Sequence, residues 1–210
     1  MPKLPNPPPV SRLRELGPDL HTLPAQTELW RVYFRGSEHS ASWSTFRIFG
    51  PNANARFDHH LPPPSAQQRG ILYAATHVAT CLAEVFQKTR VIDTVHREPW
   101  LVGFATAAPV SLLDLTGAWP TVAGASMAIN SGPRPRARLW SRAIYDAYPQ
   151  VDGLWYASSM NANRPAVALY ERAQRALPPE PTVHRALADP LLQVSLRNVA
   201  ADLGYSLNLA

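Results

Sequence analysis

Apolar and polar residues alternate over residues 29–34, the pattern of a β-strand. One face of this predicted strand carries Leu29, Arg31 and Tyr33, so a charged side chain stands among apolar neighbours. An arginine in such a place needs a polar partner or a cleft. Short apolar runs bounded by turn residues predict further strands over residues 70–75, 101–107, 111–115, 153–156 and 166–170, although the last run also permits a helix.

Helical spacing of apolar residues follows directly after the predicted strand over residues 70–75. It predicts a helix over residues 76–88 with Thr76 as its N-cap. The buried stripe of this helix is formed by Val78, Leu82, Val85 and Phe86. Glu84 falls on the face away from that stripe, so the helical pattern by itself predicts a solvated carboxylate there.

Two more helices complete the predicted elements. One covers residues 136–148 and is closed by Pro149; the other begins at Asp189-Pro190, as N-cap and first residue, and ends near Gly204. Residues 50–69 and 117–133 are interpreted as long loops. Strands come first, with helices interspersed and no regular βαβ alternation. The pattern therefore predicts a mixed α+β or α/β sheet in a single domain.

The start of the chain differs in composition from the rest. Residues 1–24 contain seven prolines, which predicts an extended arm with a short helical turn at residues 11–16. We expect this arm to be a disordered tail. The chain is accordingly divided into a proline-rich arm, residues 1–27, and a catalytic domain, residues 28–210.

Composition excludes several classes of protein. The apolar fraction of 46% and the charged fraction of 17% are typical of a globular domain. A single cysteine cannot form an intrachain disulfide or a cysteine-rich metal site. Prolines and charges replace the apolar core of a signal peptide, and the uncharged stretches are too short or too broken to cross a bilayer. We expect a cytoplasmic protein with no membrane partner.

The net charge of +5 favours an anionic partner. Much of this charge lies in residues 134–142 and 164–185, where aromatic residues do not alternate with the basic ones as in a nucleic-acid stacking surface. Direct binding of nucleic acid is therefore disfavoured. A nucleotide diphosphate or an acidic protein fits the sign of the charge equally well.

Common catalytic motifs are missing. The sequence has neither a P-loop nor the G-x-G-x-x-G pattern, so the usual phosphate-binding loops are excluded. Ser126 lies in a segment similar to a nucleophile elbow, but the second glycine is absent. His59 and His60 are adjacent, without a third ligand at a suitable spacing. We expect a solvated pair rather than metal ligands, and no metal site.

A set of short motifs remains, and their order is informative. They are residues 30–33 (WRVY), 56–58 (RFD), 73–76 (YAAT), 83–86 (AEVF) and 152–158 (DGLWYAS). Over roughly residues 28–168 this set resembles the RES domain, which is named for its arginine, glutamate and serine. The sequence departs from the family at Ala157, where many members have proline, and in the length of the segment between Arg56 and Tyr73.

The resemblance implies an ADP-ribosyltransferase-like fold, a split mixed sheet with surrounding helices and NAD in a cleft. Described members are toxins of bacterial toxin–antitoxin pairs, which remove nicotinamide from NAD with phosphate or water as acceptor, and whose antitoxin occludes the cleft. The implied catalytic residues are Arg31, Glu84 and Ser158, and the implied substrate-binding residues are Arg56, Tyr73 and Tyr33. Ser159 remains an alternative to Ser158.

Each residue has a role that suits this chemistry. Glu84 would stabilise the cation that develops on the ribose, and Arg31 and Arg56 would bind the pyrophosphate. Tyr73 would stack on nicotinamide, while Ser158 would supply a hydrogen bond. Two alternatives stay open: a protein ADP-ribosyltransferase with the same cleft, and a non-catalytic module that binds an acidic protein.

Overall fold

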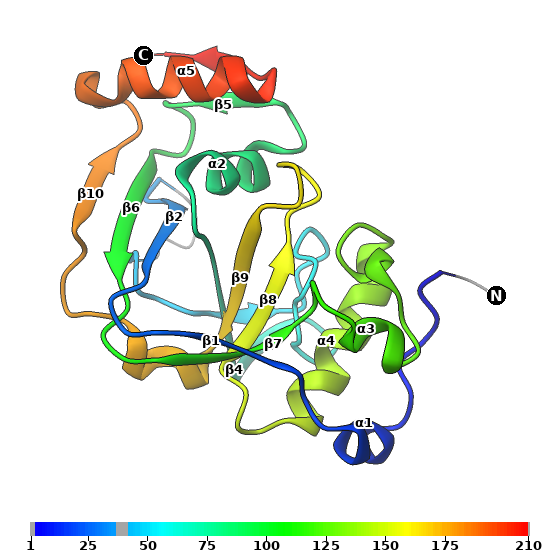
Figure 1. Ribbon diagram of the computed structural model, residues 1–210. Coiled ribbons are helices and arrows are strands. Elements are labelled where there is room, and N and C mark those ends of the chain that lie inside the picture. Colours follow the sequence, from blue (N-terminus) through cyan, green and yellow to red (C-terminus); the bar gives the residue numbers. More distant parts are fainter. Residues whose placement is uncertain (1–2, 37–41, 210) are drawn as a thin grey trace.

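A mixed sheet forms the centre of the molecule (Figure 1). The structure is a computed structural model that describes residues 3–36 and 42–209. Nine of the described strands join in this sheet, in the order β1-β7-β8-β9-β4-β2-β6-β10 with β3 beside β4. They are β1 (Leu20–Leu23), β2 (Glu28–Phe34), β3 (Arg47–Gly50), β4 (Ser65–Ala75), β6 (Pro99–Ala105), β7 (Val110–Asp114), β8 (Gly153–Ala157), β9 (Pro165–Tyr170) and β10 (Val183–Ala186).

The sheet splits between β2 and β4. These neighbouring strands share one paired position, Trp30 with Ala75. By contrast, β2 pairs with β6 along its whole length, and β4 pairs with β9 over five positions. Of the strand pairs, β7–β8 is parallel and the others in this sheet are antiparallel. The predicted single-domain mixed α/β fold with a split sheet is therefore confirmed.

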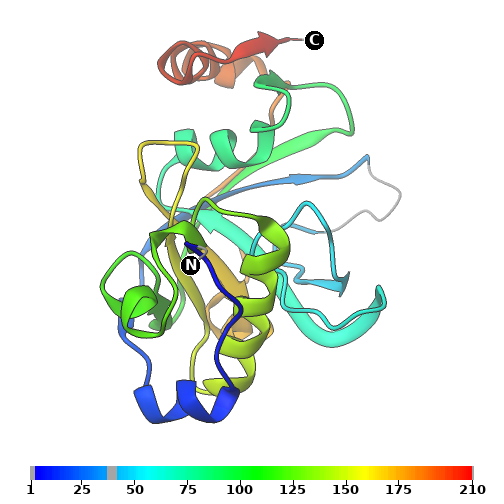
Figure 2. The same ribbon diagram turned by 90° about the vertical axis from the view of Figure 1, so that its right-hand side faces the viewer.

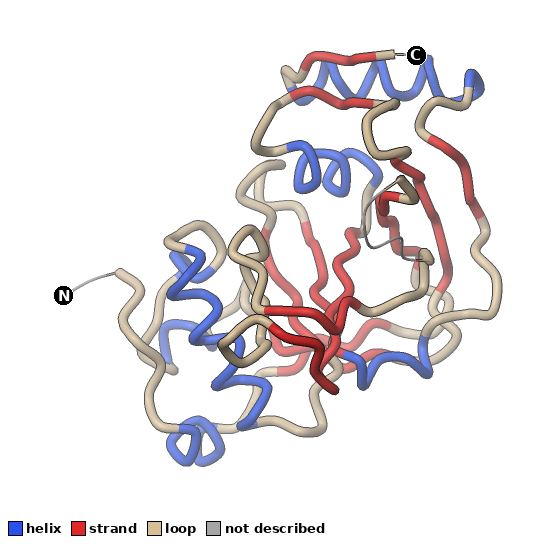
Figure 3. Tube along the Cα trace, turned by 180° about the vertical axis from the view of Figure 1, so that it is seen from behind, coloured by secondary structure: helices blue, strands red, loops and turns tan. Residues whose placement is uncertain are grey.

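Helices gather in two groups, as Figure 3 shows in blue against the red sheet. One group is α2 (Val78–Phe86) with α5 (Gln193–Leu203), beside a parallel pair formed by β5 (Val91–Asp93) and β11 (Ser206–Asn208). The other group is α1 (Val10–Leu16), α3 (Trp119–Val122) and α4 (Arg134–Ala147). Three short 3₁₀ helices are η1 (Met127–Ile129), η2 (Glu171–Ala176) and η3 (Pro190–Leu192).

The largest helix, α4, shows how the sequence pattern determines the packing. It follows Pro133 and carries a second proline in its first turn, where the missing N–H costs nothing. Ala137, Trp140 and Ile144 recur at helical spacing and are fully buried in the main core. A second core, built around Leu29, Phe104 and Leu72, lies between the two parts of the split sheet.

The N-terminal arm is folded onto the domain, so the expectation of a disordered tail is wrong for its described residues. Figure 2 shows it running beside α4 toward α1. Leu4 and Leu13 are buried, and the Trp140 indole N–H donates to the carbonyl of Pro5 at 2.8 Å. The proline-rich segment stays ordered because its free carbonyls accept hydrogen bonds from side chains of the domain. The division of the chain at residue 27 stays a prediction.

Several predicted boundaries need correction. The loop expected over residues 50–69 is shorter, because β4 begins at Ser65 and its polar first half pairs with β3 as a hairpin. The second expected loop contains α3 and η1. At the C-terminal end, Asp189 caps a 3₁₀ turn before α5, which Gly204 closes in the left-handed conformation. None of the helices in the described residues is long and apolar enough to cross a bilayer.

Candidate active site

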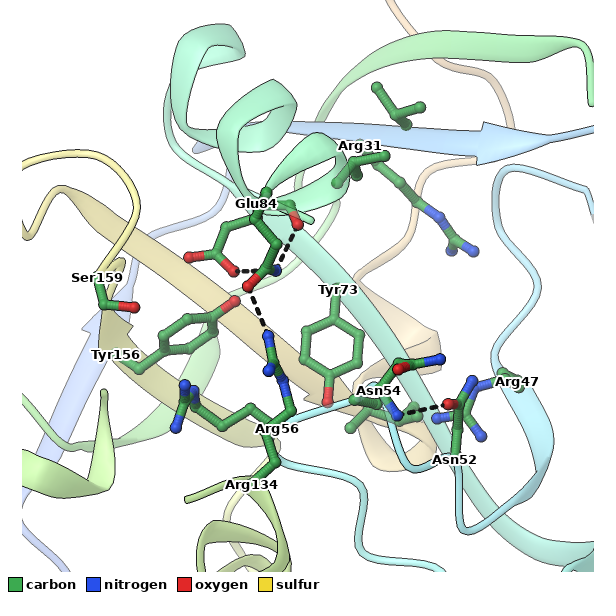
Figure 4. Close-up of a pocket in the computed structure, with 15 residues that line it drawn as sticks. Arg31, Arg47, Asn52, Asn54, Arg56, Tyr73, Glu84, Arg134, Tyr156 and Ser159 are labelled. Carbon is green, nitrogen blue, oxygen red and sulfur yellow. Dashed lines mark hydrogen bonds between the residues drawn. The ribbon is translucent and has the colours of Figure 1, made fainter. Parts of the chain in front are cut away.

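A cavity of about 340 Å³ lies beside the split in the sheet (Figure 4). Its wall combines residues of β2, β3, β4, β8, α2 and the first turn of α4 with residues of the loops that follow β3 and β8. Among the described residues that line it are four arginines, Arg31, Arg47, Arg56 and Arg134, and a single carboxylate, Glu84. Such a cavity suits a ligand with more than one negative charge.

Glu84 is the third residue from the C-terminal end of α2 and is partly buried. Its Oε1 accepts a hydrogen bond of 2.5 Å from the Ser158 hydroxyl. Burial raises the pKa of Glu84, while the Ser158 hydrogen bond and the charges of Arg56 and Arg134 oppose that rise. The solvated carboxylate expected from the helical pattern is therefore wrong, because loops distant in sequence cover this face of α2.

The structure separates the two serines. Ser158 is fully buried directly after β8, where it contacts Glu84 and accepts from the backbone N–H of Met160 at 3.2 Å. Ser159 is exposed and lines the cavity. Because the Ser158 hydroxyl proton is engaged with Glu84, Ser158 acts as a hydrogen-bond donor to the carboxylate rather than as a free nucleophile.

Arg56 and Arg134 are held beside Glu84. The Arg56 Nη1 donates to the carbonyl of Gly132 at 2.6 Å, and burial together with the charge of Arg134 lowers the pKa of Arg56. Arg134, in the first turn of α4, donates to Gln87 Oε1 at 2.6 Å, and Gln87 in turn donates to the backbone carbonyl of Glu84 at 2.6 Å. Sequence reasoning missed Arg134, although the basic cluster at residues 134–142 contained it.

Arg31 reaches a different part of the cavity wall. Its Nη1 donates to the backbone carbonyls of Trp43 at 2.9 Å and Thr45 at 3.3 Å. Burial lowers the pKa of Arg31 to about 10, so the guanidinium remains charged at neutral pH. In Figure 4 its side chain points away from Glu84. Arg31 shares the cavity with Arg56, Tyr73 and Glu84 but does not contact Glu84 directly.

The tyrosines divide between two places. Tyr73 lines the cavity, its hydroxyl accepts from the backbone N–H of Phe57 at 3.1 Å, and burial raises its pKa. Tyr156 lines the cavity as well and was missed, although it lies within the motif that ends at Ser158. Tyr33 is not brought to the cavity. Tyr33 lies two residues after Arg31 on β2, and its hydroxyl is 2.7 Å from Nε2 of His184 on β10.

The predicted solvated histidine pair is buried, so that expectation is wrong. Both rings have 0% exposure, because Tyr145 and Tyr170 pack on His59 and the end of β3 at Gly50 lies against His60. His59 stacks on Tyr145, with ring centroids 4.4 Å apart, and its Nε2 lies 3.7 Å from Glu171 Oε2. Within residues 3–36 and 42–209, no group of three or more histidine, cysteine or acidic side chains is placed to hold a metal ion.

Asp58 pairs with Arg47 and His60, not with Arg56. The Asp58 Oδ2 accepts from Arg47 at 2.8 Å, and its Oδ1 is 2.5 Å from His60 Nδ1. Burial would raise the pKa of Asp58, but hydrogen bonds from His60 and Asn52 and the charge of Arg47 hold it well below its usual range. The buried carboxylate is therefore ionised at neutral pH.

Comparison with known proteins agrees with the motifs. Residues 28–191, most of the chain, match the family model of the RES domain. The chain belongs to the RES family. In this RES-domain protein, Glu84 and Ser158 are in direct contact, and Arg31 lies on the wall of the cavity that Glu84 lines.

One solved structure supports the fold of this RES domain. It is a chain from the crystal structure of the M. tuberculosis MbcT–MbcA toxin–antitoxin complex. The likeness has a TM-score of 0.57 and covers 90% of this chain and 96% of that chain, at 18% sequence identity. At that identity the likeness concerns the fold alone. None of the curated proteins compared with the sequence matches it.

Proposed function

We propose that this RES-domain protein consumes NAD by breaking the bond between nicotinamide and ribose. The observation that carries the proposal is the environment of Glu84: a partly buried carboxylate, hydrogen-bonded to Ser158, in a cavity lined with arginines. A negative charge placed among cationic side chains suits a substrate that is cationic at its reacting end and anionic elsewhere. NAD has a nicotinamide cation at one end of a pyrophosphate.

The chemical step requires stabilisation of a cation. As the carbon–nitrogen bond breaks, its electron pair leaves with nicotinamide, which becomes neutral, and positive charge develops on the ribose. Glu84 stabilises that charge electrostatically and orients the ribose hydroxyls. An oxygen of water or phosphate then bonds to the ribose carbon. Water gives ADP-ribose and releases a proton, whereas phosphate gives the phosphorylated sugar.

The arginines supply the binding of the pyrophosphate. A guanidinium is permanently charged and offers paired donors that match phosphate oxygens. Arg56 and Arg134 lie nearest to Glu84, while Arg31 extends the basic wall. The rings of Tyr73 and Tyr156 provide aromatic surface for nicotinamide. Tyr33 has no part in this proposal, because it lies outside the cavity.

The biological role that follows is that of a toxin. Family membership and the likeness to a chain of a toxin–antitoxin complex support a cytoplasmic enzyme whose NAD-consuming activity is held in check by a protein partner. An antitoxin that covers the cavity would inhibit the enzyme simply by excluding NAD. The basic cavity favours an acidic segment in that partner.

The test is NAD loss by the purified protein, measured with and without phosphate. We expect Glu84→Gln to lower the rate at least about 100-fold, the usual size of such an electrostatic contribution. Glu15→Gln is the matched control, because Glu15 is exposed on α1 and pairs with Arg12. If the folded, antitoxin-free protein consumes no NAD in either buffer, the proposal is wrong. Label transferred from NAD to a protein in lysate would indicate a transferase instead.

A further inference from the structure

Arg47 and Asn52 form a polar end of the cavity that the mechanism above does not explain. Figure 4 shows them, with Asn54, on the opposite side of Tyr73 from Glu84. A ligand that places its ribose at Glu84 and extends past Tyr73 would bring its far end to these side chains. The arrangement of this end therefore affects which ligands the cavity accepts.

A buried carboxylate organises that end. Asp58, with 0% exposure, accepts hydrogen bonds from the Arg47 guanidinium at 2.8 Å and from the backbone N–H of Asn52 at 2.5 Å. The Arg47 guanidinium also donates to the carbonyl of Phe49. Arg47 is thus restrained on two sides, although its side chain is 31% exposed and lines the cavity. Asp58 itself does not line the cavity.

His60 fixes Asp58 from the other side. An ionised carboxylate can only accept hydrogen bonds, so the close contact between His60 Nδ1 and Asp58 Oδ1 assigns a proton to Nδ1. The backbone N–H of His60 donates to the same oxygen at 3.1 Å. The ring is packed against the end of β3, since a Cβ added at Gly50 would lie 2.6 Å from it. Asp58 is therefore anchored to the strand that carries Arg47.

We propose that Asp58 is a positioning residue that holds Arg47 and Asn52 as a second phosphate-binding end of the cavity, and that this end selects dinucleotides over mononucleotides. The identity of the ligand rests on the proposed function; the restraint on Arg47 does not. With the ribose at Glu84 and the phosphate of the nicotinamide nucleotide at Arg56 and Arg134, the phosphate of the second nucleotide reaches Arg47. A nicotinamide mononucleotide would leave this end empty.

A purely structural ion pair is the competing explanation, and the chain contains a matched control for it. Asp152 has a side chain with 5% exposure and accepts two hydrogen bonds from Arg175, at 2.6 and 2.8 Å. Neither residue lines the cavity. Asp152→Asn removes the same charge from a buried aspartate that pairs with an arginine, so it reports what a loss of stability alone does to the enzyme.

The experiment compares NAD with nicotinamide mononucleotide as substrates of Asp58→Asn, Arg47→Gln and the double variant. Loss of a charge-assisted hydrogen bond predicts a KM for NAD raised about 10-fold or more, with kcat nearly unchanged. The KM and kcat for nicotinamide mononucleotide should be unchanged. Because Asp58 acts through Arg47, the KM of the double variant for NAD should be no higher than that of Arg47→Gln. Asp152→Asn should leave the preference for NAD intact.

A second readout separates this inference from the proposed function. Binding of ADP is measured by calorimetry, which needs no catalysis. If the wild type consumes no NAD but its ADP affinity falls about 10-fold in Asp58→Asn and Arg47→Gln, the proposed function fails and the phosphate-binding end stands. If both variants bind ADP as tightly as the wild type, the inference is overturned. It is also overturned if Arg47→Gln raises the KM for NAD and for the mononucleotide by the same factor. The inference is also overturned if Asp58→Asn raises the KM for NAD as much in the Arg47→Gln variant as in the wild type.

Discussion

The hydroxyl of Ser158 donates a 2.5 Å hydrogen bond to the carboxylate of Glu84, across 74 residues of sequence. Ser158 directly follows β8, an interior strand of the sheet, whereas Glu84 belongs to α2, which packs on β2, β4 and β9. This contact ties the position of the carboxylate to the end of β8. It also opposes the rise in pKa that burial imposes on Glu84.

Ser158→Ala should therefore change the pH dependence of NAD consumption. Burial raises the pKa of Glu84, and the Ser158 hydrogen bond lowers it in part. Without that hydrogen bond the pKa of Glu84 rises further, so the acid limb of the rate profile moves to higher pH. We also expect the maximal rate to fall about tenfold, the size of one charge-assisted hydrogen bond. A reduced rate with an unmoved acid limb would contradict this account.

Glu84→Gln should abolish activity without destabilising the protein. The pKa of Glu84 is raised in the folded state, so the ionised carboxylate costs stability at every pH above its unfolded value. Glutamine removes that cost and can still accept from Ser158. The free energy of unfolding at pH 7, measured in urea, should be equal to or higher than that of the wild type. A clear loss of stability would show that the Glu84 charge is needed for folding.

Local periodicity predicted the elements that carry the site. Leu82 and Phe86 are buried in α2 as the helical pattern indicated, and Arg31 lies on a strand. Strands of three or four residues, such as β1, β3, β5, β10 and β11, were missed because so few positions cannot define an alternation. Their pairing depends on neighbours distant in sequence.

The environment of each site residue could not be predicted from the sequence pattern. Glu84 was assigned to a solvated face because its own helix contains nothing that would cover it. The cover comes from Arg134, Arg56 and Ser158, the residue directly after β8. His59 is buried for the same reason, since the aromatic rings around it come from α4 and β9. Only the motif order, through the resemblance to the RES domain, indicated that these segments meet.

The N-terminal arm should contribute to stability despite its proline content. Leu13 of α1 has 1% exposure, and its carbonyl accepts from the Tyr148 hydroxyl at 2.6 Å. Leu13→Ala should lower the free energy of unfolding by about 3 kcal/mol, as is usual for a buried leucine. Arg12→Ala is the control, because Arg12 is exposed and its ion pair with Glu15 contributes little. Equal stability of the two variants would indicate that α1 detaches in solution.

Acid should destabilise the protein through Glu171. Burial would raise the pKa of this residue, but contact with His59 and hydrogen bonds from Tyr145 at 2.6 Å and from the N–H of Gly70 at 2.8 Å lower it to about 2. The folded pKa lies below the unfolded one. The stability contributed by Glu171 is therefore present above about pH 4.5 and is lost as the pH falls toward 2.

Glu171→Gln isolates this contribution. At pH 7 the variant should lose about 1–2 kcal/mol of unfolding free energy, a value reduced for the partial exposure of the carboxylate. Between pH 5 and 3 its stability should fall less steeply than that of the wild type, because one linked proton is gone. Asp58, whose pKa is also held low, remains in both proteins and cancels in the comparison. Glu180→Gln, at an exposed position, is the control. Parallel pH profiles for wild type and Glu171→Gln would mean that Glu171 takes up its proton equally in the folded and unfolded chains.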